Sequence, residues 1–263
     1  KKLEVRSHII SIAENVLSNV RKGILDVGVD IVDVFANVLS APEAVLSRRQ
    51  KELGVVCIDI GASTTDVAVF EEGALIFSAV IALGGEHVTS DIALGLRISI
   101  DLAEKLKLEH ADVNFCKDDS QKDEEIDLSK YSKTETTTIS KKYLSEIVRA
   151  RYSEFFYFVN SELKRIGKDG MLPEGAVLTG GAAKIRGLVD LSKEILRLPT
   201  SIGIPDDGDH ISGTSLGDPQ YAGIVGTLLL SQKYTPTRSR FKFNFSTNGF
   251  FSSLKQLIQK ILP

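Results

Sequence analysis

The spacing of apolar side chains predicts a chain in which helices and short strands alternate. Residues 8–25 repeat apolar positions at the interval of an amphipathic helix. Three runs rich in β-branched or aromatic residues follow, and turn residues separate them, so we expect an antiparallel three-stranded meander. These runs are 55–60, 65–71 and 75–81.

The rest of the chain continues this alternation and indicates an α/β fold. A helix over 40–48 leads into the charged sequence 49–52, which we interpret as a turn at a domain boundary. The charged and polar stretch 110–138 predicts a small subdomain or an insertion. Helices are expected over 87–96, 99–109, 140–166, 182–196 and 219–231, and strands over 177–179 and 200–204.

The final stretch, 249–263, predicts a second kind of helix, with apolar residues on one stripe and polar residues opposite. At about 20 Å it is too short to span a bilayer. It follows the stretch 234–248, which has the composition of a linker. These features favour a helix lying on anionic lipid, although docking on a protein surface stays open. The candidate membrane-binding residues are Phe250, Phe251, Leu254, Lys255, Leu257, Ile258, Ile261 and Leu262.

Composition narrows the function classes. The 263 residues are 43% hydrophobic and 25% charged, which suffices for a sizeable core. The formal net charge of -3 offers no global basic field, so we expect no nucleic-acid partner. Only two cysteines occur, which favours a reducing cytosol over a disulfide framework. No apolar run is long enough for a transmembrane helix, and no signal peptide is visible.

The sequence from Asp59 to Asp66 is the first candidate site. An apolar run delivers Asp59, and a turn of small and hydroxyl residues follows: Gly61, Ala62, Ser63, Thr64 and Thr65. Small residues let backbone N–H groups approach an anion, and a carboxylate there can orient a metal-bound water. An ordinary hairpin turn would also look like this.

Two further motifs carry candidate ligand-binding groups. The strand over 177–179 ends in Gly180 and Gly181, followed by Ala182 and Lys184, at the expected start of a helix where an anion could bind. Glu104 and Lys107 are three residues apart and share one helix face. A tight turn and a solvated ion pair are the respective alternatives.

Taken in order, these parts resemble the second half of the actin, Hsp70 and sugar-kinase ATPase fold. Within that superfamily they resemble the FtsA family of bacterial cell division. The resemblance rests on Asp-x-Gly-x-Ser-Thr from Asp59, the pair Gly84-Gly85 opening a helix, Glu104-x-x-Lys107, and Gly180-Gly181-Ala182-Ala183. It extends from about His8 to the C-terminus.

The resemblance implies a division into subdomains. Residues 1–50 would complete the first large subdomain, 1A. Residues 54–98 and 173–233 would form subdomain 2A, and 99–172 would form subdomain 2B. The linker 234–248 and the membrane-targeting helix 249–263 would complete the chain.

The resemblance also implies roles for individual residues in binding ATP and Mg²⁺. Asp59 would hold Mg²⁺ through water. Glu104 and Lys107 would contact the ribose and adenine side. The turn residues would wrap the phosphates, and the later glycines would lie along the α-phosphate and nucleoside. The nucleotide-binding residues would be Asp59, Gly61, Ala62, Ser63, Thr64, Thr65, Gly84, Gly85, Glu104, Lys107, Gly180, Gly181, Ala182 and Lys184.

The sequence departs from the family's pattern in three places. The family's first phosphate loop would lie upstream of Lys1. Asn37 aligns where an acidic residue or Gln usually positions the attacking water, and Asn cannot act as a base. Ala62 stands where Gly is usual. We therefore expect ATP binding with slow or negligible hydrolysis.

The function implied by the resemblance is that of a filament-forming, peripheral membrane protein. It would tether the tubulin-like protein FtsZ, whose C-terminal tail would dock on subdomain 2B, to the cytoplasmic face of the inner membrane at the division site. A soluble Hsp70-type or sugar-kinase-type ATPase, and an actin-fold scaffold of a pilus or secretion machine, are the alternatives.

Overall fold

The computed structural model describes residues 3–5, 7–117, 123–131, 137–205 and 216–234. By internal contacts the chain divides into two units, Lys1–Gln232 and Lys233–Pro263. The predicted C-terminal helix lies outside the described residues, and so does the predicted linker apart from Tyr234.

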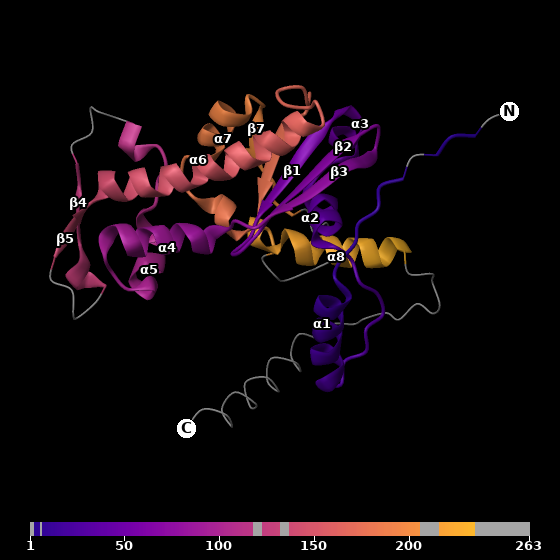
Figure 1. The fold of residues 1–263 in the computed structure, drawn as a ribbon, viewed down its shortest axis with the longest axis horizontal. Coiled ribbons are helices and arrows are strands. Elements are labelled where there is room, and N and C mark those ends of the chain that lie inside the picture. Colours follow the sequence, from indigo (N-terminus) through magenta and orange to yellow (C-terminus); the bar gives the residue numbers. More distant parts are fainter. Residues whose placement is uncertain (1–2, 6, 118–122, 132–136, 206–215, 235–263) are drawn as a thin grey trace. The chain divides into compact units, whose positions relative to one another are not determined.

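A five-stranded mixed sheet forms the centre of the first unit (Figure 1). The strand order is β3-β2-β1-β6-β7, in which β1 to β3 are antiparallel neighbours and β1, β6 and β7 are parallel. The strands are β1 (Val55–Ile60), β2 (Thr65–Glu71), β3 (Ala74–Ile81), β6 (Ala176–Thr179) and β7 (Thr200–Ile202). The predicted meander is therefore confirmed. Its second turn has positive φ at both Glu72 and Gly73, the geometry that matches the twist of a two-residue hairpin.

Helices cover both faces of this sheet. In Figure 1, α6 and α7 lie on one side of the strands, and α2 and α8 lie on the other. The helices are α1 (Glu14–Asp26), α2 (Asn37–Val45), α3 (Arg48–Leu53), α4 (Gly85–Leu96), α5 (Ile100–His110), α6 (Lys141–Arg165), α7 (Leu188–Leu196) and α8 (Ala222–Tyr234). Among the described residues, no helix is long and apolar enough to cross a membrane.

The side chains of β1 alternate between two cores, as a period of two requires. Val56, Ile58 and Ile60 enter the larger core with residues of α4 to α7. Val55 and Cys57 enter the smaller core, which contains Val38 of α2. Burial on both faces explains why residues 55–58 of this strand form a continuous apolar run.

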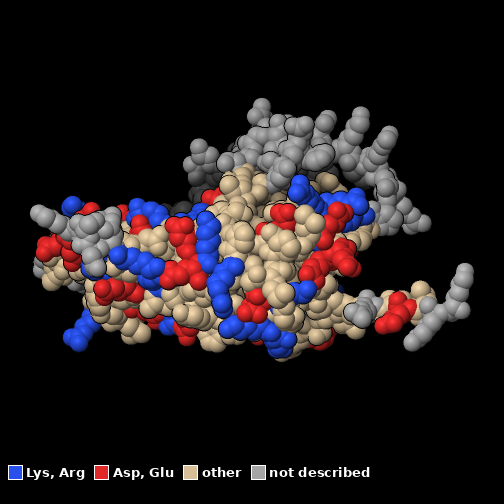
Figure 2. Space-filling model, turned by 90° about the horizontal axis from the view of Figure 1, so that it is seen from above, with Lys and Arg blue, Asp and Glu red and all other residues tan. Residues whose placement is uncertain are grey.

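Residues 110–138 contain the short elements η1 (Phe115–Lys117), β4 (Glu125–Asp127) and η2 (Leu128–Lys130). β4 pairs with β5 (Thr138–Ser140) as a separate two-stranded antiparallel sheet. The following helix, α6, is capped by Ser140, whose hydroxyl accepts from the Tyr143 N–H at 2.9 Å. Figure 2 shows Lys and Arg interspersed with Asp and Glu on the face that it presents.

The helix predicted over 182–196 is wrong in its first part. The chain forms a short 3₁₀ helix, η3 (Gly181–Lys184), and then an isolated bridge between Arg186 and Asp112 before α7 starts. Gly187 separates the two helices with φ +77°. Apolar spacing continues across this break, so periodicity alone could not show it.

Two other expectations also differ from the structure. The sequence 49–52 is not a turn but lies inside α3. Ser47 and Gln50 form a capping box, with Gln50 N–H donating to Ser47 Oγ at 3.2 Å and Ser47 N–H donating to Gln50 Oε1 at 2.9 Å. The first helix begins at Glu14 rather than residue 8.

Candidate nucleotide-binding site

The parallel pairing of β1 with β6 brings the two glycine turns together. Asp59 and Thr179 are cross-strand neighbours, and each strand ends in its turn immediately afterwards. A Cβ added to Gly180 would lie 2.3 Å from Asp59 Oδ1. The bare backbone of Gly180, at φ +88°, is therefore required for the two strand ends to meet.

The start of α4 is fastened to the first of these turns. Gly85 N–H donates to Gly61 O at 2.9 Å, and Glu86 N–H donates to Ala62 O at 2.8 Å. A Cβ on Gly84 would lie 2.3 Å from Ala62 O, so only glycine permits this approach. Three separate segments of the sequence thus meet at the carboxyl ends of β1 and β6.

A cavity of about 620 Å³ opens where these segments meet α5. Its size is within the range of small-molecule sites. Its floor includes Tyr152 of α6, whose hydroxyl donates to Ala182 O at 3.1 Å. The predicted site residues that line it are Gly61, Ala62, Gly85, Glu104, Lys107, Gly181, Ala182 and Lys184.

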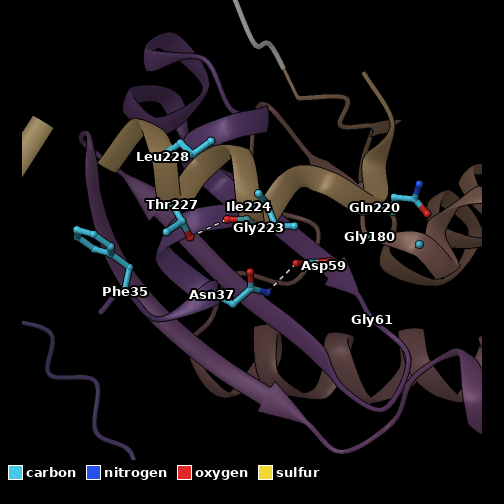
Figure 3. Close-up of a pocket in the computed structure, with 11 residues that line it drawn as sticks. Phe35, Asn37, Asp59, Gly61, Gly180, Gln220, Gly223, Ile224, Thr227 and Leu228 are labelled. Carbon is cyan, nitrogen blue, oxygen red and sulfur yellow. Dashed lines mark hydrogen bonds between the residues drawn. The ribbon is translucent and has the colours of Figure 1, made fainter. Parts of the chain in front are cut away.

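A second cavity, of about 520 Å³, adjoins the first through shared Gly61, Gly181 and Gln220. Figure 3 shows it between the end of β1 and the helices α2 and α8. Two predicted residues, Asp59 and Gly180, line this cavity and not the first. The two cavities together give an elongated space with glycine backbone at its middle.

Four predicted residues line neither cavity and instead support the turns. Ser63 Oγ donates to Glu86 Oε2 at 2.9 Å, and buried Thr65 donates through Oγ1 to Leu83 O at 2.8 Å. The carbonyl oxygen of Thr64 accepts from Gly61 N–H at 2.9 Å. The fourth is Gly84, at the close approach described above.

Glu104 and Lys107 form an ion pair on the cavity side of α5, with 2.7 Å between Oε2 and Nζ. Burial raises the pKa of Glu104, but hydrogen bonds from Lys107 and Thr89 outweigh it, so the pKa lies below its usual value. The carboxylate is therefore ionised at neutral pH and can accept hydrogen bonds from ligand hydroxyls.

Lys184 is held at the rim by a residue that the sequence analysis missed. Its Nζ lies 3.0 Å from Asp218 Oδ2, and Asp218 Oδ1 accepts from Gln220 N–H at 3.0 Å. Pro219 O accepts from Gly180 N–H at 3.1 Å, and this bond holds the turn at Asp218 and Pro219 against the glycine pair. The Asp-Pro sequence is a helix-start signal that could have identified the turn.

Asn37, which lines the second cavity, shares its amide group between two carboxylates. Asn37 Nδ2 donates to Asp59 Oδ2 and to Asp66 Oδ2, each at 2.8 Å (Figure 3 shows the first bond). Burial raises the pKa of both carboxyl groups, and the bond from Asn37 opposes that rise. Asp66 ends the first candidate segment but was given no role, although the predicted hairpin places it opposite Asp59.

These groups fit a magnesium ion. Mg²⁺ is bound by oxygen, commonly one or two carboxylates with water and substrate phosphates completing the shell. Asp59 and Asp66 supply two neighbouring carboxylates beside the bare glycine backbone. A cation there would also relieve the burial cost that these charges carry.

Comparison with known proteins decides the family. The family model for cell division protein FtsA matches residues 56–226. The chain belongs to the FtsA family. It is 35% identical to FtsA of Pseudomonas aeruginosa over 228 residues, which is 87% of this chain and 54% of the relative. It is 34% identical to FtsA of Bacillus subtilis, covering 86% and 50%. The chain thus spans about half the length of these curated relatives.

Solved structures show the same fold for this FtsA-family chain. MreB5 of Spiroplasma citri, in a crystal structure bound to ADP, superposes with a TM-score of 0.66 at 20% identity over 84% of this chain and 66% of that one. A type IV pilus biogenesis complex, PilM-PilN, gives 0.59 at 19% identity, covering 81% and 57%. The predicted actin-like α/β fold is therefore confirmed.

We expect the Asp66→Asn variant of this FtsA-family chain to be more stable at pH 7, by about 1 kcal/mol. The folded-state pKa of Asp66 is raised, so its ionised form opposes folding above that pKa. As pH falls below the unfolded value of about 3.9, Asp66 is protonated in both states and the advantage disappears. Urea unfolding at several pH values measures this, and a variant less stable than the parent at pH 7 would contradict it.

Proposed function

We propose that this chain binds Mg·ATP in the two adjoining cavities. The observation that carries the proposal is the meeting of three distant segments, the turns at Gly61, Gly85 and Gly180, along one elongated space. Ligands of open α/β sheets bind outside the carboxyl ends of parallel strands, which is where β1 and β6 end. The family membership supports the same ligand.

The residues suggest a direction for the nucleotide. The carboxylate of Glu104 in the first cavity would accept hydrogen bonds from ribose hydroxyls. Phosphates would extend past Gly61 and Gly181, where no side chain obstructs the backbone. Mg²⁺ would be held near Asp59, through water, and would neutralise phosphate charge there.

Hydrolysis would be slow in this site. Asn37 aims its amide nitrogen at two carboxylates, so that group is occupied and has no basic lone pair to offer. Asp59 and Asp66 accept the two hydrogen bonds of this group, and Mg²⁺ would compete with protons for both carboxylates. The nucleotide would then act as a ligand that controls conformation and assembly.

At the level of the cell, the chain would be part of a filament that tethers FtsZ to the membrane. The C-terminal helix predicted over 249–263 would bind anionic lipid on the cytoplasmic face of the inner membrane. One short helix binds weakly, so self-assembly of the actin-like body would supply avidity. The FtsZ tail would dock within residues 99–172.

Vesicle co-sedimentation tests the membrane part. The Phe251→Asn, Leu254→Asn variant removes apolar area without changing charge, and a chain truncated after Thr235 removes the whole stretch. We expect both to lose at least about tenfold in binding to anionic vesicles, since each side chain contributes roughly 1.5–3 kcal/mol on burial.

The matched control is Ser253→Asn with Gln256→Asn, which changes the polar face by the same chemistry. It should pellet with vesicles like the parent. Equal pelleting of all four chains, or pelleting of none at low salt with the body shown to be folded, would contradict the proposed anchor.

A further inference from the structure

The side chain of Asn37 bridges the ends of two strands. Its Nδ2 donates to Asp59 Oδ2 on β1 and to Asp66 Oδ2 on β2, each at 2.8 Å. A primary amide nitrogen carries two N–H donors, so this bridge uses both. Asp59 and Asp66 are cross-strand partners. The amide therefore lies between two carboxylates whose like charges oppose each other.

An amide replaces a cation only partly at this position. It gives each carboxylate a hydrogen bond but supplies no positive charge. A divalent cation would attract both carboxylates at once, and carboxylate oxygens are ligands that Mg²⁺ accepts. Asn37 and Asp59 both line the second cavity, so an ion in this cavity would meet the bridge directly.

The bridge also attaches a helix to the strand ends, because Asn37 is the first residue of α2. On its other side the amide is packed against α8, since a Cβ on Gly223 would lie 2.3 Å from Asn37 Oδ1. Mg²⁺ keeps several waters when it binds to carboxylates, so it needs more room than one amide nitrogen. The amide and a hydrated cation cannot both occupy the space between Asp59 and Asp66.

We propose that Asn37 is a displaceable bridge, which holds Asp59 and Asp66 in the metal-free protein and turns out into the second cavity when a divalent cation binds them. Asn37 then lowers the affinity of this pair for the cation, because two hydrogen bonds to charged groups are lost on binding. The inference rests on the proposed function for its biological role, in which the same carboxylates serve Mg·ATP.

The experiment measures the binding of Mn²⁺ alone to the full chain, using electron paramagnetic resonance to count the free ion. Mn²⁺ takes the same carboxylate and water ligands as Mg²⁺. Asn37→Ala should bind Mn²⁺ at least about tenfold more tightly than the parent, because no hydrogen bond has to be broken. An affinity equal to that of the parent, or a weaker one, would overturn the inference.

The matched control is Thr227→Val, which keeps the shape of a side chain that lines the same cavity. The Thr227 hydroxyl donates to Ser40 Oγ and Gly223 O and not to the carboxylate pair. Its Mn²⁺ affinity should stay within about twofold of the parent. A gain equal to that of Asn37→Ala would show that loosening the contact between α2 and α8 suffices, and would overturn the role given to Asn37.

Removing the carboxylates locates the bound ion. In the Asn37→Ala background, replacing both Asp59 and Asp66 with asparagine should lower the Mn²⁺ affinity by at least about tenfold, because the amides leave no negative charge at the site. Tight binding that survives this change would place the ion elsewhere and overturn the inference.

Nuclear magnetic resonance follows the bridge itself in the parent chain. The side-chain NH₂ signals of Asn37 are identified by their loss in Asn37→Ala. Mg²⁺ at a concentration that displaces bound Mn²⁺ should move these signals toward those of solvent-exposed amides and speed their exchange with water. Unchanged signals at that concentration would show a cation bound beside an intact bridge, which contradicts displacement.

Calorimetry of the parent with Mg·ATP separates this inference from the proposed function. If Mg·ATP binds but Asn37→Ala gains no affinity for Mn²⁺, the displaceable bridge is overturned and the proposed function stands. If the folded parent binds no Mg·ATP while Mg²⁺ alone displaces Asn37, the bridge is supported and the proposed function fails.

Discussion

Replacing Gly180 with alanine is expected to lower the affinity for Mg·ATP by at least about tenfold and the free energy of unfolding by about 2 kcal/mol. The residue lies at φ +88°, where a side chain is strained. Its added Cβ would lie 2.3 Å from Asp59 Oδ1 and 2.5 Å from Ile60 O. Relieving these clashes moves the carboxylate and the turn together, so binding and stability are both lost.

The neighbouring glycine provides the control. A Cβ on Gly181 would meet nothing nearer than Gln220 Cβ at 3.8 Å, and its φ is not positive. Gly181→Ala should keep the free energy of unfolding within about 0.5 kcal/mol of the parent. Calorimetry measures the affinity of Gly180→Ala and urea unfolding measures the stability of both variants, and an equal loss of stability in the two would contradict this account of the turn.

Replacing Gly226 with alanine is expected to lower the free energy of unfolding by about 3 kcal/mol, the upper end for overpacking a buried site. The helix α8 crosses α2 so closely that a Cβ on Gly226 would lie 1.7 Å from Ser40 O. Thr227 Oγ1 donates to Ser40 Oγ at 3.0 Å beside the crossing. The helices must separate to admit a methyl group, which also displaces the second cavity that they line.

A glycine with free space around its Cα is expected to have the opposite effect on stability when it is replaced by alanine. Gly23 lies within α1, and its added Cβ would meet nothing within 4 Å. Gly23→Ala should raise the free energy of unfolding by about 0.5–1 kcal/mol through helix propensity alone. Urea unfolding of both variants checks the pair, and a stabilised Gly226→Ala chain would show that the crossing is not close packed.

The strands of the sheet could be predicted because burial and turn chemistry agree along that part of the chain. The strands β1 and β2 have the predicted bounds, since a run that is apolar except at Asp59 ends at Gly61 and hydroxyl residues follow. The break at Gly187 could not be predicted. It depends on contact with Asn114, whose Cγ would lie 2.8 Å from a Cβ on that glycine.

The site was only partly predictable for a related reason. Order along the chain predicts the glycine turns, and the structure brings them together through parallel pairing of β1 with β6. The ammonium group of Lys107 donates hydrogen bonds to Thr89 and Gly85, which lie on another helix. The contact of Asn37 with Asp59 and Asp66 likewise depends on how α2 packs on the sheet. Sequence spacing carries no information on such contacts between elements.

Hydrogen–deuterium exchange of the full chain, with and without saturating Mg·ATP, tests the central claim most directly. The account predicts slower exchange in three separate segments, around residues 61–64, 84–89 and 180–184, with no comparable change in α1. Protection confined to one of these segments, protection only outside the residues that line the two cavities, or no protection at all in a folded chain would contradict the assignment of the two cavities as one nucleotide site.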